Sequence, residues 1–257
     1  MTLEFGFNEI EIDALESPSV EAVWTYFNSF GSQHYIVPDG RADLIFTFYI
    51  KANGCLTNIR PIISPAFTKA HSINIAPYQG FIGLRLRAGL AGSILQVPLP
   101  LITGRIQYDS HVMGYVPWVE KICDDKRSIK HLITEINRHV IAAVPQFNSS
   151  MIGEALSLMA HGHGTMAISD IACELAVSER TINRHFTQAI GLSPKQYSSI
   201  LRVKNVIIQL TTPHYTISDI ALNCGFSDQS NMTRDIKNHM GKTPIHLRKI
   251  LTTELLF

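Results

Sequence analysis

Cysteine is scarce in this sequence, and the few cysteines present lie far apart. The 257 residues include four, and no two of them form a CxxC pair. Disulfide-stabilised secreted domains carry dense cysteine frameworks instead. The pattern therefore excludes a disulfide scaffold and favours a reduced intracellular protein.

Long hydrophobic runs are also missing. The most apolar stretch, 89–102, is interrupted by Pro98 and Pro100 and follows Arg85 and Arg87. A membrane-spanning helix needs about 20 consecutive apolar residues. The first residues show no basic segment leading into an apolar run, as a secretory signal would. We therefore expect no membrane partner and a cytoplasmic location.

Neither sign of charge is in excess. The chain has 22 basic and 21 acidic residues, a net charge of +1, and residues 146–257 hold 10 basic and 8 acidic residues, a net +2. Nucleic-acid-binding domains often carry a strong basic excess. A prediction of DNA binding must therefore rest on residue pattern and not on net charge.

An internal duplication occupies the second half of the chain. The pentapeptide Ile-Ser-Asp-Ile-Ala stands at 168–172 and again at 217–221. Further matches follow in order, with one inserted residue: Arg184 with Arg234, Gly191 with Gly241, and Pro194 with Pro244. An ordered series over about thirty residues indicates a repeated structural unit.

Each copy predicts two helices joined by a short turn. Serines stand where N-caps belong, apolar residues recur at helical spacing, and a glycine ends the second helix. The segment 194–210 predicts a connecting helix between the copies. The caps and stops are Ser169, Ser178 and Gly191 in the first copy, and Ser218, Ser227 and Gly241 in the second.

The second helix of each copy carries polar residues suited to reading DNA bases. Arginine can bind guanine, and asparagine or glutamine can bind adenine, in the major groove. The N-caps Ser178 and Ser227 would place a hydroxyl and free backbone N–H groups beside a phosphate. A solvated polar helix face is the alternative interpretation. The candidate base-reading residues are Arg180, Asn183, Arg184, Gln229, Ser230, Thr233 and Arg234.

These motifs resemble the DNA-binding domain of AraC/XylS-type transcription regulators. The resemblance rests on Val177-Ser-Glu-Arg-Thr-Ile-Asn-Arg-His-Phe186 in the first copy and on Gly225-Phe-Ser-Asp-Gln-Ser230 in the second. Arg202 matches the basic residue that opens the family's linker helix. Met232, Ile236 and Leu247 depart from the family's aromatic residues, all on the core side. The resemblance implies a non-enzymatic, sequence-specific regulator, with activation as the expected effect and repression left open.

The first part of the chain predicts a different kind of domain. Strands are expected at 42–50, 59–63, 71–76 and 80–86, and a helix at 128–144, while a helix at 148–160 is expected to begin the second domain. We predict an α+β two-domain protein: a mostly β N-terminal regulatory domain with terminal helices at 1–145, then an all-α domain at 146–257 whose helix-turn-helix motifs lie at about 168–190 and 217–240.

The segments 37–46 and 81–92 resemble the N-terminal domain of one poorly characterised branch of these regulators. Many relatives sense a small molecule or dimerise through this domain. The resemblance therefore implies double-stranded DNA as a partner, and RNA polymerase, a small-molecule effector and a second copy of the chain as further candidate partners. The helix at 128–144 carries an apolar stripe that predicts either packing on its own β domain or a dimer seam: Ile129, Leu132, Ile133, Ile136 and Val140.

Some histidine and cysteine residues could be read as a metal site or as redox sensors, but their spacing does not favour either interpretation. His161 and His163 near Cys173 lack a complete zinc-ligand spacing, so no metal or other cofactor is predicted. Cys173 and Cys224 are expected to be small buried residues and not redox sensors.

In the N-terminal part, the hydrolytic interpretation of His34, Asp39 and Asp43 is set against ordinary turn chemistry. Arg85 and Arg87 could bind an anionic effector or form a salt-bridged face. Two other function classes stay open: an N-terminal enzyme brought to DNA by the C-terminal part, and a module that binds only proteins.

Overall fold

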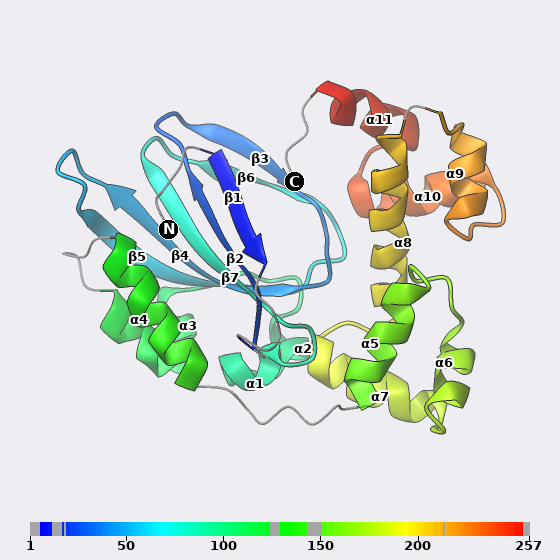
Figure 1. The fold of residues 1–257 in the computed structure, drawn as a ribbon, viewed down its shortest axis with the longest axis horizontal. Helices are drawn as coiled ribbons and strands as arrows, with labels where there is room; N and C mark the ends of the chain where they lie inside the picture. The colour runs from blue at the N-terminus through cyan, green and yellow to red at the C-terminus, as the bar shows by residue number, and fades with distance from the viewer. Residues whose placement is uncertain are drawn as a thin grey trace.

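The structure, a computed structural model, describes residues 6–11, 17, 19–123, 129–142, 151–212 and 214–253. A β-rich N-terminal region lies beside a helical C-terminal region (Figure 1). This arrangement confirms the predicted α+β fold class. The predicted boundary between residues 145 and 146 lies outside the described residues and stays a prediction.

An antiparallel sheet forms the framework of the N-terminal region. Its strand order is β1-β2-β7-β4-β5-β8, and β3 pairs with β6 in a separate two-stranded sheet. The four predicted strands correspond to β4, β5, β6 and β7. The strands are β1 (Gly6–Glu11), β2 (Val20–Phe27), β3 (Ser32–Ile36), β4 (Ala42–Ile50), β5 (Leu56–Ser64), β6 (His71–Ile75), β7 (Gln79–Leu86) and β8 (Gln107–Tyr108).

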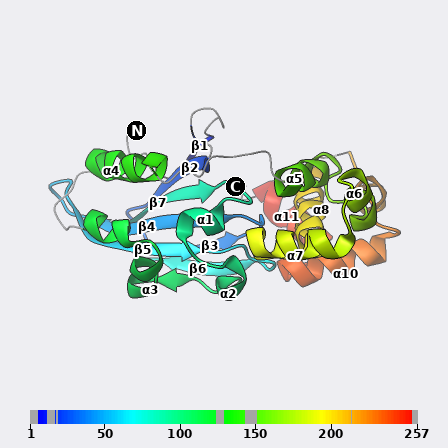
Figure 2. The ribbon, with the colours of Figure 1, turned by 90° about the horizontal axis from the view of Figure 1, so that it is seen from below.

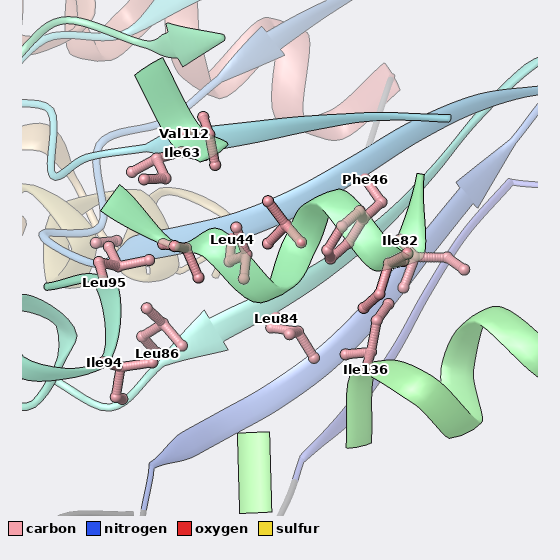
Figure 3. Packing of buried hydrophobic residues seen from close by; sticks show 14 of the residues in the cluster. Leu44, Phe46, Ile63, Ile82, Leu84, Leu86, Ile94, Leu95, Val112 and Ile136 are labelled. Atoms are coloured by element: carbon pink, nitrogen blue, oxygen red, sulfur yellow. The ribbon is translucent and has the colours of Figure 1, made fainter. Parts of the chain in front are cut away.

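Short helices cover one face of this sheet. Alternate residues of β4 and β7, such as Phe46 and Leu84, are buried beneath them because side chains alternate between the two faces of a strand. Figure 3 shows Ile136 of α4 pointing toward this core. The covering elements are α1 (Ala91–Leu95), α2 (Leu99–Ile102), α3 (Asp109–Tyr115), the 3-10 helix η1 (Pro117–Ile122) and α4 (Ile129–Ala142).

The C-terminal region consists of helices around α8, which matches the predicted connecting helix. One apolar cluster joins α5, α6 and α7 to the first half of α8, and a second joins α9, α10 and α11 to its second half. The helices are α5 (Met151–His161), α6 (Ile168–Glu174), α7 (Glu179–Ile190), α8 (Pro194–Leu210), α9 (Ile217–Asn223), α10 (Gln229–Met240) and α11 (Pro244–Thr253).

The turns between the paired helices show why the two copies differ in sequence. Ala176 and Gly225 take equivalent places, and both have positive φ, 52° and 74°. In the second copy a Cβ on Gly225 would lie 2.5 Å from Cγ2 of Thr165. Glycine is therefore required in the second turn both by backbone conformation and by space.

Candidate nucleic-acid interface

The polar face of α7 gathers the base-reading residues predicted for the first copy. Ile182 and Phe186 are fully buried on the opposite face, which turns the polar side chains outward. Arg180, Asn183 and Arg184 are exposed there. They line one shallow hollow together with Thr187, Gln188 and Pro100, the last of which comes from α2.

The polar face of α10 is arranged in the same way. Met232 and Ile236 are fully buried, as the core-side departures predict. Gln229, Ser230 and Arg234 are exposed and Thr233 is half-buried. These four residues line a second hollow with Lys237 and Asn238.

Besides Pro100, four residues of α7 and α10 that line these hollows were missed by sequence reasoning: Thr187, Gln188, Lys237 and Asn238. The four share a simple positional signal. Each stands four positions after a predicted contact, and such pairs share a helix face. Helical spacing alone could therefore have found them. The assignment of either set to DNA contact stays a prediction.

Several side chains on these faces are engaged within their own motif. The Asn183 amide donates to the Glu179 carbonyl at 2.8 Å, and the Ser218 hydroxyl donates to the Gln229 amide oxygen at 2.9 Å. Arg184 Nη2 lies 3.0 Å from His185 Nε2. These contacts orient the side chains within the motif.

The predicted cap of α7 is confirmed, while that of α10 is wrong. Ser178 accepts a hydrogen bond from the Thr181 backbone N–H at 3.1 Å. In α10 the N-cap is Asp228, which accepts from the Asn231 backbone N–H at 2.7 Å. Ser227 makes no bond to a backbone N–H there: its hydroxyl donates to the Asp228 carboxylate at 3.2 Å and accepts from the Asn231 side-chain amide at 3.0 Å. The residue inserted in the second copy moves the helix start by one position. An ionised carboxylate at this cap would also repel a phosphate, so the phosphate site expected at Ser227 is not supported.

The first helix of each motif also begins before its predicted cap. The N-cap of α6 is Ala167, with no side-chain bond, and Ser169 lies inside the helix. The N-cap of α9 is Thr216, which exchanges hydrogen bonds with Asp219 in a capping box, and Ser218 lies inside that helix. A capping box satisfies two backbone donors, which a lone serine cannot do.

We expect Asp228→Ala to lower the melting temperature of the protein at pH 7, and Ser227→Ala to change it less. The bond from the Asn231 backbone holds the Asp228 pKa below its usual range. The stabilisation is therefore present at neutral pH and lost as the pH falls below about 4. Melting curves at pH 7 and pH 3 check this. Equal effects of the two substitutions at pH 7 would contradict the assigned cap.

Arg202 in α8 connects the two motifs. Its Nη1 donates to the Gly164 carbonyl, just before the first motif, at 3.0 Å. Its Nη2 lies 3.9 Å from the Asp235 carboxylate in α10, and its guanidinium lies 5.5 Å from the centre of the Phe226 ring. Arg202 thus helps to fix the position of α10 relative to the start of the first motif.

The hydrogen-bond and ion-pair partners of Arg85 and Arg87 distinguish the two interpretations of these arginines. Arg85 pairs with Glu9 at 2.9 Å and lies 3.6 Å from Asp39 and 3.8 Å from Asp43, which supports the salt-bridged face. Arg87 donates to the backbone carbonyls of residues 17 and 20.

The hydrolytic grouping does not assemble. His34 Nε2 bonds to the hydroxyls of Tyr26 at 2.8 Å and Ser32 at 2.9 Å. Asp39 instead accepts the backbone N–H of Arg41 at 3.0 Å, as turn chemistry predicts.

The metal and redox interpretations gain no support. In the part of the chain that the structure describes, no three His, Cys, Asp or Glu side chains gather as a metal site. Cys224 is buried as expected, and burial raises its pKa to about 11. Cys173 is exposed, so its expected burial is wrong. Ala172, the residue before it, faces the core, so the Cys173 side chain points away from the core in α6.

Asp43 provides a pH-dependent prediction. Burial and the nearby Asp39 carboxylate raise its pKa to about 7, well above its usual 3.8. Stability from this group is therefore fully present below pH 4 and is lost as the pH rises through 7. Asp43→Asn can still accept the bond that Trp24 Nε1 donates at 3.2 Å. We expect this variant to be more stable than the parent by about 1–3 kcal/mol at pH 8, and similar at pH 4.

Chemical denaturation at the two pH values measures this difference. Asp170→Asn, at an exposed position, is the control. A variant that is no more stable than the parent at pH 8 would show that the pKa of Asp43 is not raised in the folded protein.

Comparison with known proteins agrees with the geometry of the C-terminal region. A family profile described as "Helix-turn-helix domain" matches residues 171–250. An uncharacterised HTH-type transcriptional regulator of Staphylococcus aureus is 24% identical over 132 residues, 48% of this chain and 18% of that protein. The Msm operon regulatory protein of Streptococcus mutans is 32% identical over 85 residues, 33% of this chain and 31% of that protein.

The HTH-type transcriptional activator RhaR of Escherichia coli is 24% identical over 163 residues, 62% of this chain and 56% of that protein. The chain therefore matches about a fifth to just over half of the length of these relatives.

Matches to solved structures were also found. An AraC-type regulator from Chromobacterium violaceum is 30% identical and covers 41% of this chain and 95% of its own, with a TM-score of 0.38. ToxT from Vibrio cholerae is 13% identical and covers 96% of this chain and 99% of its own, with a TM-score of 0.46. Among the described residues, no helix is long and apolar enough to cross a membrane.

The family profile spans α7, α10 and α8, the helix that joins the two motifs. Its position agrees with the duplicated motif, the caps at Gly191 and Gly241, and the two outward polar faces. The C-terminal region of this chain is an AraC/XylS-type helix-turn-helix DNA-binding domain.

Proposed function

We propose that the protein is a sequence-specific transcription regulator that inserts α7 and α10 into successive major grooves on one side of the DNA. The observation that carries this proposal is the pair of exposed polar hollows, one on each helix, backed by two apolar clusters that meet at α8. The Arg202 contacts to Gly164 and Asp235 favour a fixed separation between them.

The N-terminal β region has the regulatory role in this proposal. The proposal also assigns three interactions to the protein: binding of an effector, contact with RNA polymerase and assembly with a second copy. A protein that acts on DNA in this way would work in the cytoplasm. No group of side chains described above favours the enzyme alternative.

Selection of bound sequences from a random DNA pool tests the proposal. Two helices in successive grooves predict two short conserved blocks whose centres lie about 10 base pairs apart, one helical turn. Binding should also weaken steeply with salt, because phosphate contacts release counterions. A single conserved block, or binding that is insensitive to salt, would contradict the proposal.

A further inference from the structure

Helix α2 of the N-terminal region lies directly against α7, the first reading helix (Figure 2). The Thr103 hydroxyl, at the end of α2, lies within donating distance, 2.9 Å, of two carbonyls: that of Leu99 in its own helix and that of Gly191, which ends α7. The fit is close: a Cβ on Gly191 would lie 2.5 Å from Thr103 Oγ1 and 3.1 Å from Leu99 Cβ. The contact joins regions 88 residues apart in sequence.

The contact extends onto the polar face of α7. Pro100 lines the same hollow as Arg180, Asn183 and Arg184. Its neighbour Leu101 has 71% of its surface exposed. A segment of the N-terminal region therefore stands beside the side chains that would read DNA.

The second reading helix is held differently. The N-terminal region contacts only the C-terminal end of α10, as far as the described residues show: Ala70 N–H donates to the His239 carbonyl at 2.7 Å, and the Tyr35 hydroxyl donates to the Met240 carbonyl. The ammonium group of Lys242, just beyond the helix, lies 4.9 Å from the centre of the Tyr35 ring. The residues found to line the α10 hollow all come from α10. Its polar face is therefore open where that of α7 is partly covered.

A major groove has little room for both α7 and α2. The groove is about 12 Å wide, and a helix with its side chains is about 10–12 Å across. The segment 98–103 reads Pro-Leu-Pro-Leu-Ile-Thr and carries no basic residue. Pressed against a phosphate backbone, it would remove water from charged oxygens without replacing it by a favourable contact. The composition of α2 thus argues against a DNA-contacting role.

We propose that α2 is an autoinhibitory contact that keeps α7 out of the major groove while α10 is free, so that the second helix-turn-helix engages DNA first. The inference rests on the proposed function, since it concerns the regulation of the same reading surface. Displacement of α2 from α7 then completes binding.

Holding α2 on α7 by a cross-link tests this order of binding. Pro100→Cys and Gln188→Cys, combined with serine at Cys55, Cys123 and Cys173, are joined by a short cleavable bis-thiol reagent. On a selected two-block duplex, the cross-linked protein should protect only the block read by α10 and bind at least about 10-fold more weakly. Cleavage of the linker should restore protection of the second block and the affinity of the untreated protein. The chain with Pro100→Cys but not Gln188→Cys, treated with the same reagent, is the control.

Loosening the contact should have the opposite effect. Thr103→Val removes the hydroxyl bond to Gly191 and should tighten DNA binding about 2- to 10-fold, since one net hydrogen bond no longer favours the closed arrangement. Thr211→Val is the matched control, because its hydroxyl donates only within the end of α8, to Ile208 at 2.7 Å.

Two results would overturn the inference: protection of both blocks by the cross-linked protein, or weaker binding by Thr103→Val. Failure of the proposed function would look different, because the untreated parent protein would then select no sequence from the random pool. In that case both proposals fall.

Discussion

Replacing both Arg184 and Arg234 by alanine is expected to weaken binding to the selected duplex by about 2–6 kcal/mol while the fold remains intact. Each arginine lies on an exposed helix face, so its removal costs little packing. A bidentate contact to guanine contributes about 1–3 kcal/mol of discrimination, and contacts in separate grooves should add. Titration of labelled duplex at fixed salt measures the loss, and circular dichroism checks the fold.

The single variants make this prediction sharper. Arg184→Ala should relax sequence preference in one block only, and Arg234→Ala in the other. Arg138→Ala is the matched control, because this arginine is 64% exposed and pairs with Glu135 in the N-terminal region. If either reading-helix variant kept the parent's affinity and preference, its assignment to base reading would be wrong.

Ile136→Lys is expected to unfold the N-terminal region and lead to aggregation. Only 1% of the Ile136 surface is exposed, and the side chain packs in the core with Phe46 and Leu84. An unpaired ammonium group in such a core costs about 3–5 kcal/mol, a large part of the stability of a domain. Thermal unfolding and solution mass measure the outcome.

This prediction separates the two interpretations of the apolar stripe on α4. Leu132 and Ile136 are buried on their own sheet, which supports intramolecular packing; the side chains of Ile129 and Val140 lie outside the described residues. Thr134→Lys, at an exposed position of the same helix, should be tolerated. A folded, monomeric Ile136→Lys protein with weakened DNA binding would instead indicate a dimer seam.

The helical region could be predicted closely because its signals are local. The capping box between Ser193 and Gln196, with Pro194 in the first turn, marks the start of α8. Glycine at 191 and 241 adopts the left-handed conformation that ends α7 and α10. Apolar residues at helical spacing then turn the polar face outward, which is why the candidate base-reading residues were placed on the exposed side.

The longest predicted strand was found for a similar reason, since β4 contains a dense run of β-branched and aromatic residues at 45–50. Strands β1 and β2 were not assigned, although β2 contains Val20, Val23 and Tyr26 and lies between β1 and β7. The order in which strands pair depends on contacts between residues far apart in the chain. The pattern of about ten consecutive residues therefore cannot show which strands pair with one another.

The amino-acid sequence by itself determined the duplicated motif, the glycine ends of α7 and α10, and the outward polar faces, because a repeat is visible in the sequence and the other two depend on residues within a few turns of one another. Only the tertiary structure decided that Asp228 caps α10, that Arg202 joins Gly164 to Asp235, and that Pro100 and Thr103 of the N-terminal region lie on α7. The cap depended on where one inserted residue falls, and the other contacts join side chains that only the packing of two regions brings together.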